Sequence, residues 1–163
     1  MPARVVAIVG SSGSGKTTLI ERLIPELRTR GLSVSTIKHT HHHAVELDTP
    51  GKDSHRHRVA GASEVIVASD TGWARLAASP RPASLDTLLA ELRPVDVVLI
   101  EGFKQLAGFR RVEVFRGAGV PLALADSGID AVAAPVELAL AGYAGRRLPL
   151  EDLAAIADYV LSD

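Results

Sequence analysis

Short apolar runs alternate with segments of helical periodicity along the 163 residues. Runs rich in Val, Ile and Ala predict strands, and apolar residues three and four positions apart predict helices. This alternation predicts an α/β fold with a mostly parallel sheet flanked by helices. The predicted strands are 4–9, 33–38, 64–69, 73–78, 95–100, 111–116 and 121–125, and the predicted helices are 16–30, 54–60, 84–92 and 150–161. We expect the strand 73–78 to pair antiparallel with 64–69.

A glycine-rich segment joins the first predicted strand to the first predicted helix. It reads G-S-S-G-S-G-K-T-T and has the spacing of a Walker A phosphate loop. Glycines let successive backbone N–H groups turn towards a phosphate chain, and the helix adds the positive end of its dipole. Lys16 is placed to reach the β- and γ-phosphates, and the Thr17 hydroxyl suits Mg²⁺. The predicted nucleotide-binding residues are Gly10, Ser12, Gly13, Ser14, Gly15, Lys16, Thr17 and Thr18.

Length and composition narrow the class of protein. A chain of 163 residues without a long polar linker predicts one P-loop nucleotide-binding domain over residues 1–163, with a three-layer P-loop NTPase fold. A net charge of −1 argues against a basic surface for nucleic acid or membranes. The absence of cysteine excludes disulfides and thiolate metal sites. We expect no membrane span and a cytoplasmic protein.

Glu101 directly follows the predicted strand 95–100. Ligands of such folds bind beyond the carboxyl ends of the strands, so Glu101 would lie beside the phosphate loop if its strand neighbours the first one. There the carboxylate could hold Mg²⁺ through water or orient an attacking water. A solvated loop carboxylate is the alternative. Asp96 begins the same strand and is expected at the opposite end.

All six histidines lie between residues 39 and 57. If residues 38–43 are extended, His39, His41 and His43 share one face, and their neutral imidazoles suit Zn²⁺ or Ni²⁺. A second interpretation, which we favour, has Lys38 and His39 contacting phosphates or another anionic ligand. Simple solvent exposure is a third interpretation.

Several further segments occur together in one order. They are I-K-H-T-H-H at 37–42, D-T-P-G-K-D-S at 48–54, A-G-A at 60–62, E-G-F-K at 101–104 and V-E-V at 112–114. With the phosphate loop, this combination closely resembles the MobB family of molybdopterin-guanine dinucleotide biosynthesis proteins. The resemblance spans residues 4 to about 116.

The resemblance implies a homodimeric, GTP-binding accessory or adapter protein of molybdenum cofactor biosynthesis. Its implied partners are the MobA-type guanylyltransferase and molybdopterin or its guanine dinucleotide, and its own GTP hydrolysis is expected to be weak. The phosphate loop would hold GTP and Mg²⁺, with Lys16 and Glu101, the Walker B acid, at the reacting end. The residues expected to line the adjacent face, where the pterin phosphate or the transferase would dock, are Lys38, His39, Lys52, Asp53 and Arg56.

Guanine selectivity rests on the resemblance, because the chain contains no asparagine and therefore no N-K-x-D motif. By position, Asp126 after the predicted strand 121–125 could accept from the N1 and N2 donors of guanine. A turn carboxylate is an equal alternative. Two other functions remain open: a histidine-rich GTPase that delivers a metal, and a small-molecule kinase.

Overall fold

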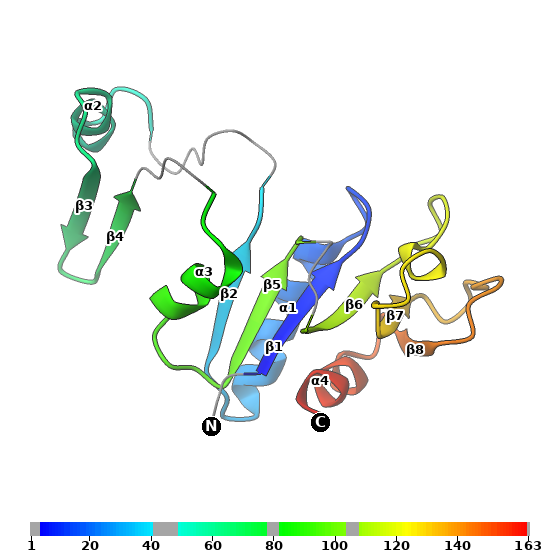
Figure 1. Cartoon of the computed structure of the whole chain (residues 1–163). Helices are drawn as coiled ribbons and strands as arrows, with labels where there is room; N and C mark the ends of the chain where they lie inside the picture. Colours follow the sequence, from blue (N-terminus) through cyan, green and yellow to red (C-terminus); the bar gives the residue numbers. More distant parts are fainter. Residues whose placement is uncertain (1–3, 41–48, 78–81, 104–107, 163) are drawn as a thin grey trace. The chain divides into compact units, whose positions relative to one another are not determined.

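The computed structural model describes residues 4–40, 49–77, 82–103 and 108–162 (Figure 1). They form two compact units. The larger unit comprises Met1–His39 and Leu92–Asp163, and the smaller unit comprises Thr40–Glu91. The single nucleotide-binding domain expected over residues 1–163 remains a prediction.

The larger unit is built on a six-stranded sheet in the order β2-β5-β1-β6-β7-β8. Every neighbouring pair is parallel. This sheet confirms the predicted α/β class. The strands are β1 (Arg4–Val9), β2 (Val34–Lys38), β5 (Val97–Glu101), β6 (Arg110–Val114), β7 (Ala131–Ala134) and β8 (Arg146–Pro149).

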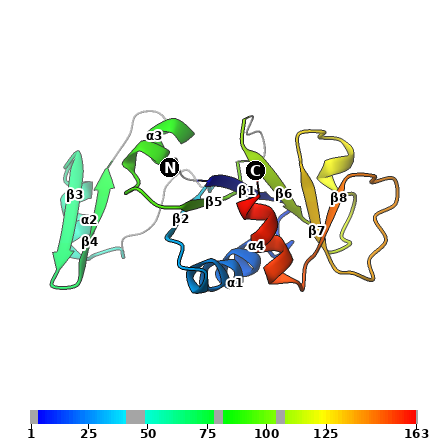
Figure 2. The same ribbon diagram turned by 90° about the horizontal axis from the view of Figure 1, so that it is seen from below.

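Two helices, α1 (Lys16–Thr29) and α4 (Leu153–Leu161), pack side by side on one face of this sheet (Figure 2). Alternate strand residues such as Ile8 and Leu99 form one core cluster with Leu23 of α1 and Ile156 of α4. All four side chains are fully buried, which explains the strand and helix periodicities of the sequence. None of the helices among the described residues has the length and apolar character needed to cross a membrane.

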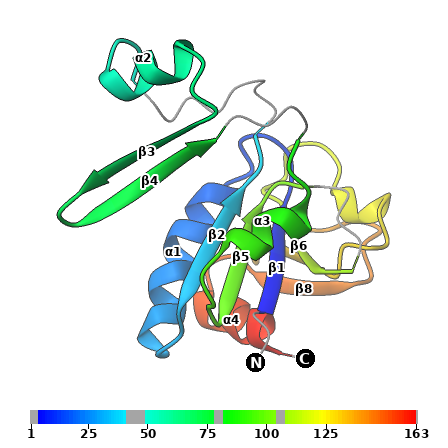
Figure 3. The same ribbon diagram turned by 60° about the vertical axis from the view of Figure 1, so that its left-hand side comes forward.

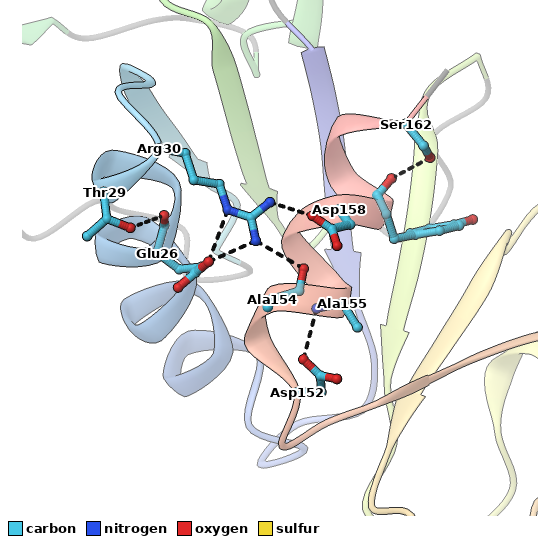
Figure 4. A network of polar contacts seen from close by, with 9 residues as sticks. Glu26, Thr29, Arg30, Asp152, Ala154, Ala155, Asp158 and Ser162 are labelled. Atoms are coloured by element: carbon cyan, nitrogen blue, oxygen red, sulfur yellow. Dashed lines mark hydrogen bonds and ion pairs between the residues drawn. The ribbon is translucent and has the colours of Figure 1, made fainter.

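Arg30, just beyond the end of α1, connects this helix to α4 through hydrogen bonds (Figure 4). Its guanidinium donates to Asp158 at 2.5 Å and to the Ala154 carbonyl at 3.2 Å, and it also binds Glu26. At the start of α4, the Asp152 carboxylate accepts the Ala155 N–H at 2.9 Å. This N-cap explains why α4 begins at 153 rather than at the predicted 150.

The opposite face of β6 and β7 is covered by loops. Phe115, Val132 and Ala134 are buried there against Ala123 and other residues of the loops that follow these strands. The predicted strand 121–125 is wrong, because residues Leu122–Leu124 form a 3-10 turn, η1. The buried Glu113 carboxylate accepts the N–H groups of Leu122 at 2.8 Å and Ala123 at 2.9 Å. These two N–H groups are therefore not available to a strand ladder.

The smaller unit contains the antiparallel hairpin of β3 (Glu64–Ser69) and β4 (Gly72–Ala77), as predicted (Figure 3). Helix α2 (Asp53–Val59) contacts β3, and α3 (Leu85–Glu91) begins after Ser84, whose hydroxyl accepts the Thr87 N–H at 3.1 Å. Arg75 of β4 forms an ion pair with Glu91 at the end of α3. Among the described residues of this unit, only Val65 and Leu85 are buried.

Candidate nucleotide-binding site

The phosphate loop lies between the end of β1 and the start of α1. Gly10 has φ 141°, in the region that favours glycine. A Cβ on Gly10 would lie 2.6 Å from the Val114 carbonyl oxygen and 2.7 Å from Ser14 Oγ. Glycine at position 10 therefore lets the loop pass against the end of β6. Ser14 Oγ is buried and has no hydrogen-bond partner among the described residues.

The charge of Lys16 lies inside the loop. Its Nζ donates to the carbonyl oxygens of Gly10 at 3.1 Å and Ser11 at 2.7 Å. Helix α1 starts after Gly15 without a side-chain cap and without an acidic residue in its first turn. The helix dipole and the lysine therefore act together to favour an anion at this position.

Glu101, at the end of β5, lies beside the phosphate loop because β5 pairs with β1. The Thr17 hydroxyl donates to its Oε1 at 2.8 Å, and Lys38 Nζ lies 3.4 Å from the same oxygen. The Glu101 side chain is 15% exposed and that of Lys38 is 62% exposed. The hydroxyl and carboxylate oxygens fit a hard cation such as Mg²⁺. The predicted adjacency of Glu101 and the loop is confirmed.

His39 lies on the other side of the Glu101 backbone. Its backbone N–H donates to the Glu101 carbonyl at 2.9 Å, and its ring centroid is 4.5 Å from that of Phe103. Gly102, with φ 94°, lets these tilted rings approach each other, because a Cβ there would be 3.3 Å from His39 Cβ. Lys38 and His39 therefore both lie beside Glu101 on its β2 side, and the anionic-ligand contact expected of them remains a prediction.

Asp96 lies at the opposite end of the sheet from the phosphate loop, as predicted. Its carboxylate accepts the Ser33 hydroxyl at 2.6 Å and the Ser33 N–H at 2.8 Å. The Ser33 hydroxyl, followed by its backbone N–H, lowers the pKa of Asp96 from the ordinary 3.8. Asp96 is thus a structural carboxylate that joins two loops.

The remaining docking residues belong to the smaller unit. The Asp53 Oδ1 atom lies 3.7 Å from a terminal guanidinium nitrogen of Arg56. Both residues line an open cleft of about 660 Å³, together with His55, His57 and neighbouring residues of α2. Lys52 immediately precedes α2. Their grouping with Lys38 and His39 on one face remains a prediction.

The metal interpretation of the histidines depends on positions outside the described residues, since His41 and His43 lie in the segment 41–48. The part of the chain that the structure describes contains no group of three or more His, Asp or Glu side chains that could hold a metal ion. The anionic-ligand interpretation of these histidines remains a prediction.

Asp126 follows the η1 turn and not a strand, so the structural premise for its guanine-reading role is wrong. Both its carboxylate oxygens bind the Arg111 guanidinium, at 2.7 and 3.0 Å, and Oδ1 also accepts the Gly128 N–H. Arg111 first, and then this N–H, lowers the pKa of Asp126 from 3.8. Contact with guanine remains a prediction and would have to compete with this pair.

Arg116 also lies beside the phosphate loop, although it is absent from the predicted binding residues. A Cβ on Gly15 would lie 2.9 Å from Arg116 Nε and 3.4 Å from its Cζ, so the guanidinium lies over the phosphate loop. The side chain is exposed. Arg116 ends the segment predicted as strand 111–116, and the rule that ligands bind beyond strand ends points to it.

A phosphate loop at the carboxyl edge of a parallel sheet, with a carboxylate of the neighbouring strand bound to its threonine, defines the class of P-loop nucleotide-binding proteins. Residues 5–135 match the family described as molybdopterin guanine dinucleotide synthesis protein B, MobB. The chain belongs to the MobB family, which confirms the resemblance found in the sequence.

Individual relatives agree with this assignment. The chain is 40% identical over 164 residues to the molybdopterin-guanine dinucleotide biosynthesis adapter protein of Escherichia coli, covering 96% of this chain and 91% of that protein. It is 52% identical over 103 residues to the adapter protein of Haemophilus influenzae, covering 62% of this chain and 57% of the relative. The crystal structure of Bacillus subtilis MobB superposes with a TM-score of 0.77 at 28% identity, over 97% of this chain and 96% of that one.

Proposed function

We propose that this chain is a GTP-binding adapter of molybdopterin-guanine dinucleotide biosynthesis that acts as a homodimer with a MobA-type guanylyltransferase. Membership of the MobB family and the names of the two bacterial relatives support the pathway. The observation that carries the nucleotide part is the hydrogen bond from Thr17 to Glu101 beside a loop that encloses Lys16.

In this proposal the loop N–H groups and Lys16 bind the phosphates of GTP. Thr17 and Glu101 would hold Mg²⁺, which supplies positive charge against the phosphate oxygens. In the present arrangement Glu101 Oε1 already accepts from Thr17 and pairs with Lys38. These contacts hold the carboxylate beside Thr17, and we propose that hydrolysis of the bound GTP is weak.

Calorimetric titration with GTP and with ATP, each with and without Mg²⁺, tests the nucleotide site. We expect GTP to bind more tightly than ATP, and Lys16→Ala to abolish binding, because the lysine supplies the ammonium among neutral backbone donors. Arg28→Ala, in the exposed last turn of α1, is the matched control and should bind like the wild type. Unchanged GTP affinity in Lys16→Ala would remove the nucleotide assignment.

The role of Glu101 is tested by Glu101→Gln. We expect GTP affinity to be largely retained and the slow hydrolysis to fall, because the charge beside Thr17 is lost while the amide fills the same space. Hydrolysis at the wild-type rate would show that Glu101 takes no part in the reaction.

The adapter role is tested in a reconstituted guanylyltransferase reaction. We expect Lys38→Ala or His39→Ala to reduce the stimulation of guanine dinucleotide formation without unfolding the protein. Both residues end or follow a core strand and are exposed, so truncation opens no core cavity. Untagged protein should fold and bind GTP without a bound transition metal. One tightly held metal per chain, with full stimulation by both variants, would favour the metal-delivery GTPase instead.

A further inference from the structure

The loop after β6 connects the phosphate loop to an apolar groove in the larger unit. Arg116 lies over Gly15, and the next residue, Gly117, already belongs to the groove. The groove has a volume of about 250 Å³, and its walls include Phe115, Val120, Leu124, Leu138 and Leu140. One short segment therefore both contacts the phosphate loop and lines the groove.

The two flanks of the phosphate loop differ in charge. On the β5 flank, the Glu101 carboxylate binds Thr17, which is where a cation at the γ-phosphate would be held. On the β6 flank, Arg116 is exposed and forms no hydrogen bond or ion pair with the residues that the structure describes. A phosphate chain crossing this edge would meet Mg²⁺ ligands on one side and an unpaired guanidinium on the other.

The groove suits the nucleoside end of such a ligand. It lies beyond the carboxyl ends of β6, which neighbours β1, and of β7, which follows β6 in the sheet; doubly wound sheets bind nucleotides beyond such strand ends. Aromatic and aliphatic side chains line most small-molecule pockets and bury flat rings well. The side chains that line this groove are Phe, Val, Leu, Pro and Ala, with two glycines, and none of them hydrogen-bonds a base.

We propose that Arg116 binds the α- or β-phosphate of the nucleotide and that the groove beginning at Gly117 receives the nucleoside. This inference rests on the proposed GTP site and specifies how the bound nucleotide is oriented. The γ-phosphate points to Glu101 on the β5 flank, and the base points to β7.

Dissociation constants for GTP and GDP with Arg116→Met test the phosphate contact, because methionine keeps an apolar stem over Gly15 and removes the charge. We expect about a tenfold loss of affinity for both nucleotides, since the lost contact is to a phosphate that GTP and GDP share. Arg116→Lys should retain most of the affinity. Arg28→Ala, at the other end of α1, should bind like the wild type.

The groove is tested by Ala139→Trp, which places an indole from an exposed position into it. We expect GTP and GDP to bind at least tenfold more weakly, with an unchanged thermal unfolding midpoint. Arg116→Met within twofold of the wild type, or a loss confined to GTP, would overturn the phosphate contact. Normal binding by Ala139→Trp would overturn the nucleoside placement. Normal GTP binding by Lys16→Ala would instead overturn the proposed GTP site itself. The Lys16→Ala result therefore distinguishes failure of the proposed function from failure of this inference.

Discussion

The two units use similar apolar residues in opposite ways. In the larger unit, Val97–Ile100 of β5 are at most 2% exposed, because neighbouring strands and packed layers cover them. In the hairpin of the smaller unit, Ile66 is 59% exposed and Trp73 is 60% exposed. A two-stranded sheet cannot bury both of its faces within itself. The packed core supports the candidate nucleotide site, whereas the hairpin leaves large apolar side chains exposed.

Truncation of an apolar side chain should give the largest difference in unfolding free energy between the two units. Leu23→Ala, in the fully buried face of α1, should lower the free energy of unfolding by about 2–5 kcal/mol, because it leaves a cavity between α1 and the sheet. Ile66→Ala in the hairpin should cost less than about 0.5 kcal/mol. Chemical denaturation of both variants measures the difference. Equal losses would mean that the hairpin is buried in solution, and the comparison would fail.

The buried carboxylate of β6 should give the next largest effect. Glu113→Gln leaves one of the two N–H groups in η1 facing an amide NH₂, which should cost about 1–3 kcal/mol. Glu137→Gln, an exposed change, is the control. Urea unfolding followed by circular dichroism is the measurement, and a cost no larger than that of the control would show that Glu113 does not hold η1.

Removing one helix N-cap from each unit allows the effects on stability to be compared directly. Asp152→Ala removes the cap of α4, which packs on the main core, and should lower global stability by about 1 kcal/mol. Ser84→Ala removes a similar cap of α3 in the smaller unit and should leave the main unfolding transition unchanged. Thermal unfolding of both proteins checks this, and matching shifts would show that the two units unfold together.

The pH dependence of the Arg111–Asp126 pair should be the smallest effect. Arg111 lowers the pKa of Asp126 below 3.8, so its stabilising contribution is present above the unfolded value and is lost as pH falls through the folded one. The stability difference between wild type and Asp126→Asn should therefore be present at neutral pH and shrink below about pH 4. A difference that is independent of pH would contradict the ion pair.

The sequence predicted the fold where elements have regular patterns. β1, α1 and the hairpin β3–β4 were predicted within one or two residues, because apolar periodicity and glycine positions mark them. β7 and β8 were missed, since each has four residues and their sequences, AVAA and RRLP, have weak strand propensity. The run 121–125 resembles a strand in isolation, but its own backbone hydrogen bonds and two bonds to the Glu113 carboxylate hold it as a turn.

The sequence likewise predicted those parts of the candidate site that have local patterns. The phosphate loop and Glu101 follow from local spacing and from the rule on strand ends. The pairing of Lys38 with Glu101 depends on the strand order β2-β5-β1, which no local pattern contains. Arg116 was missed for the same reason, because its place over Gly15 requires β6 to be the neighbour of β1.

Hydrogen exchange measured with and without GTP and Mg²⁺ tests the central claim that the nucleotide binds in the larger unit. We expect slower exchange in residues 10–18 and in 115–121 on GTP addition, because these backbone groups surround the phosphates and the groove. The hairpin residues 64–77 should change little, and Lys16→Ala should show no protection anywhere. An unchanged phosphate loop in the wild type, with protection appearing only in 64–77, would contradict the account.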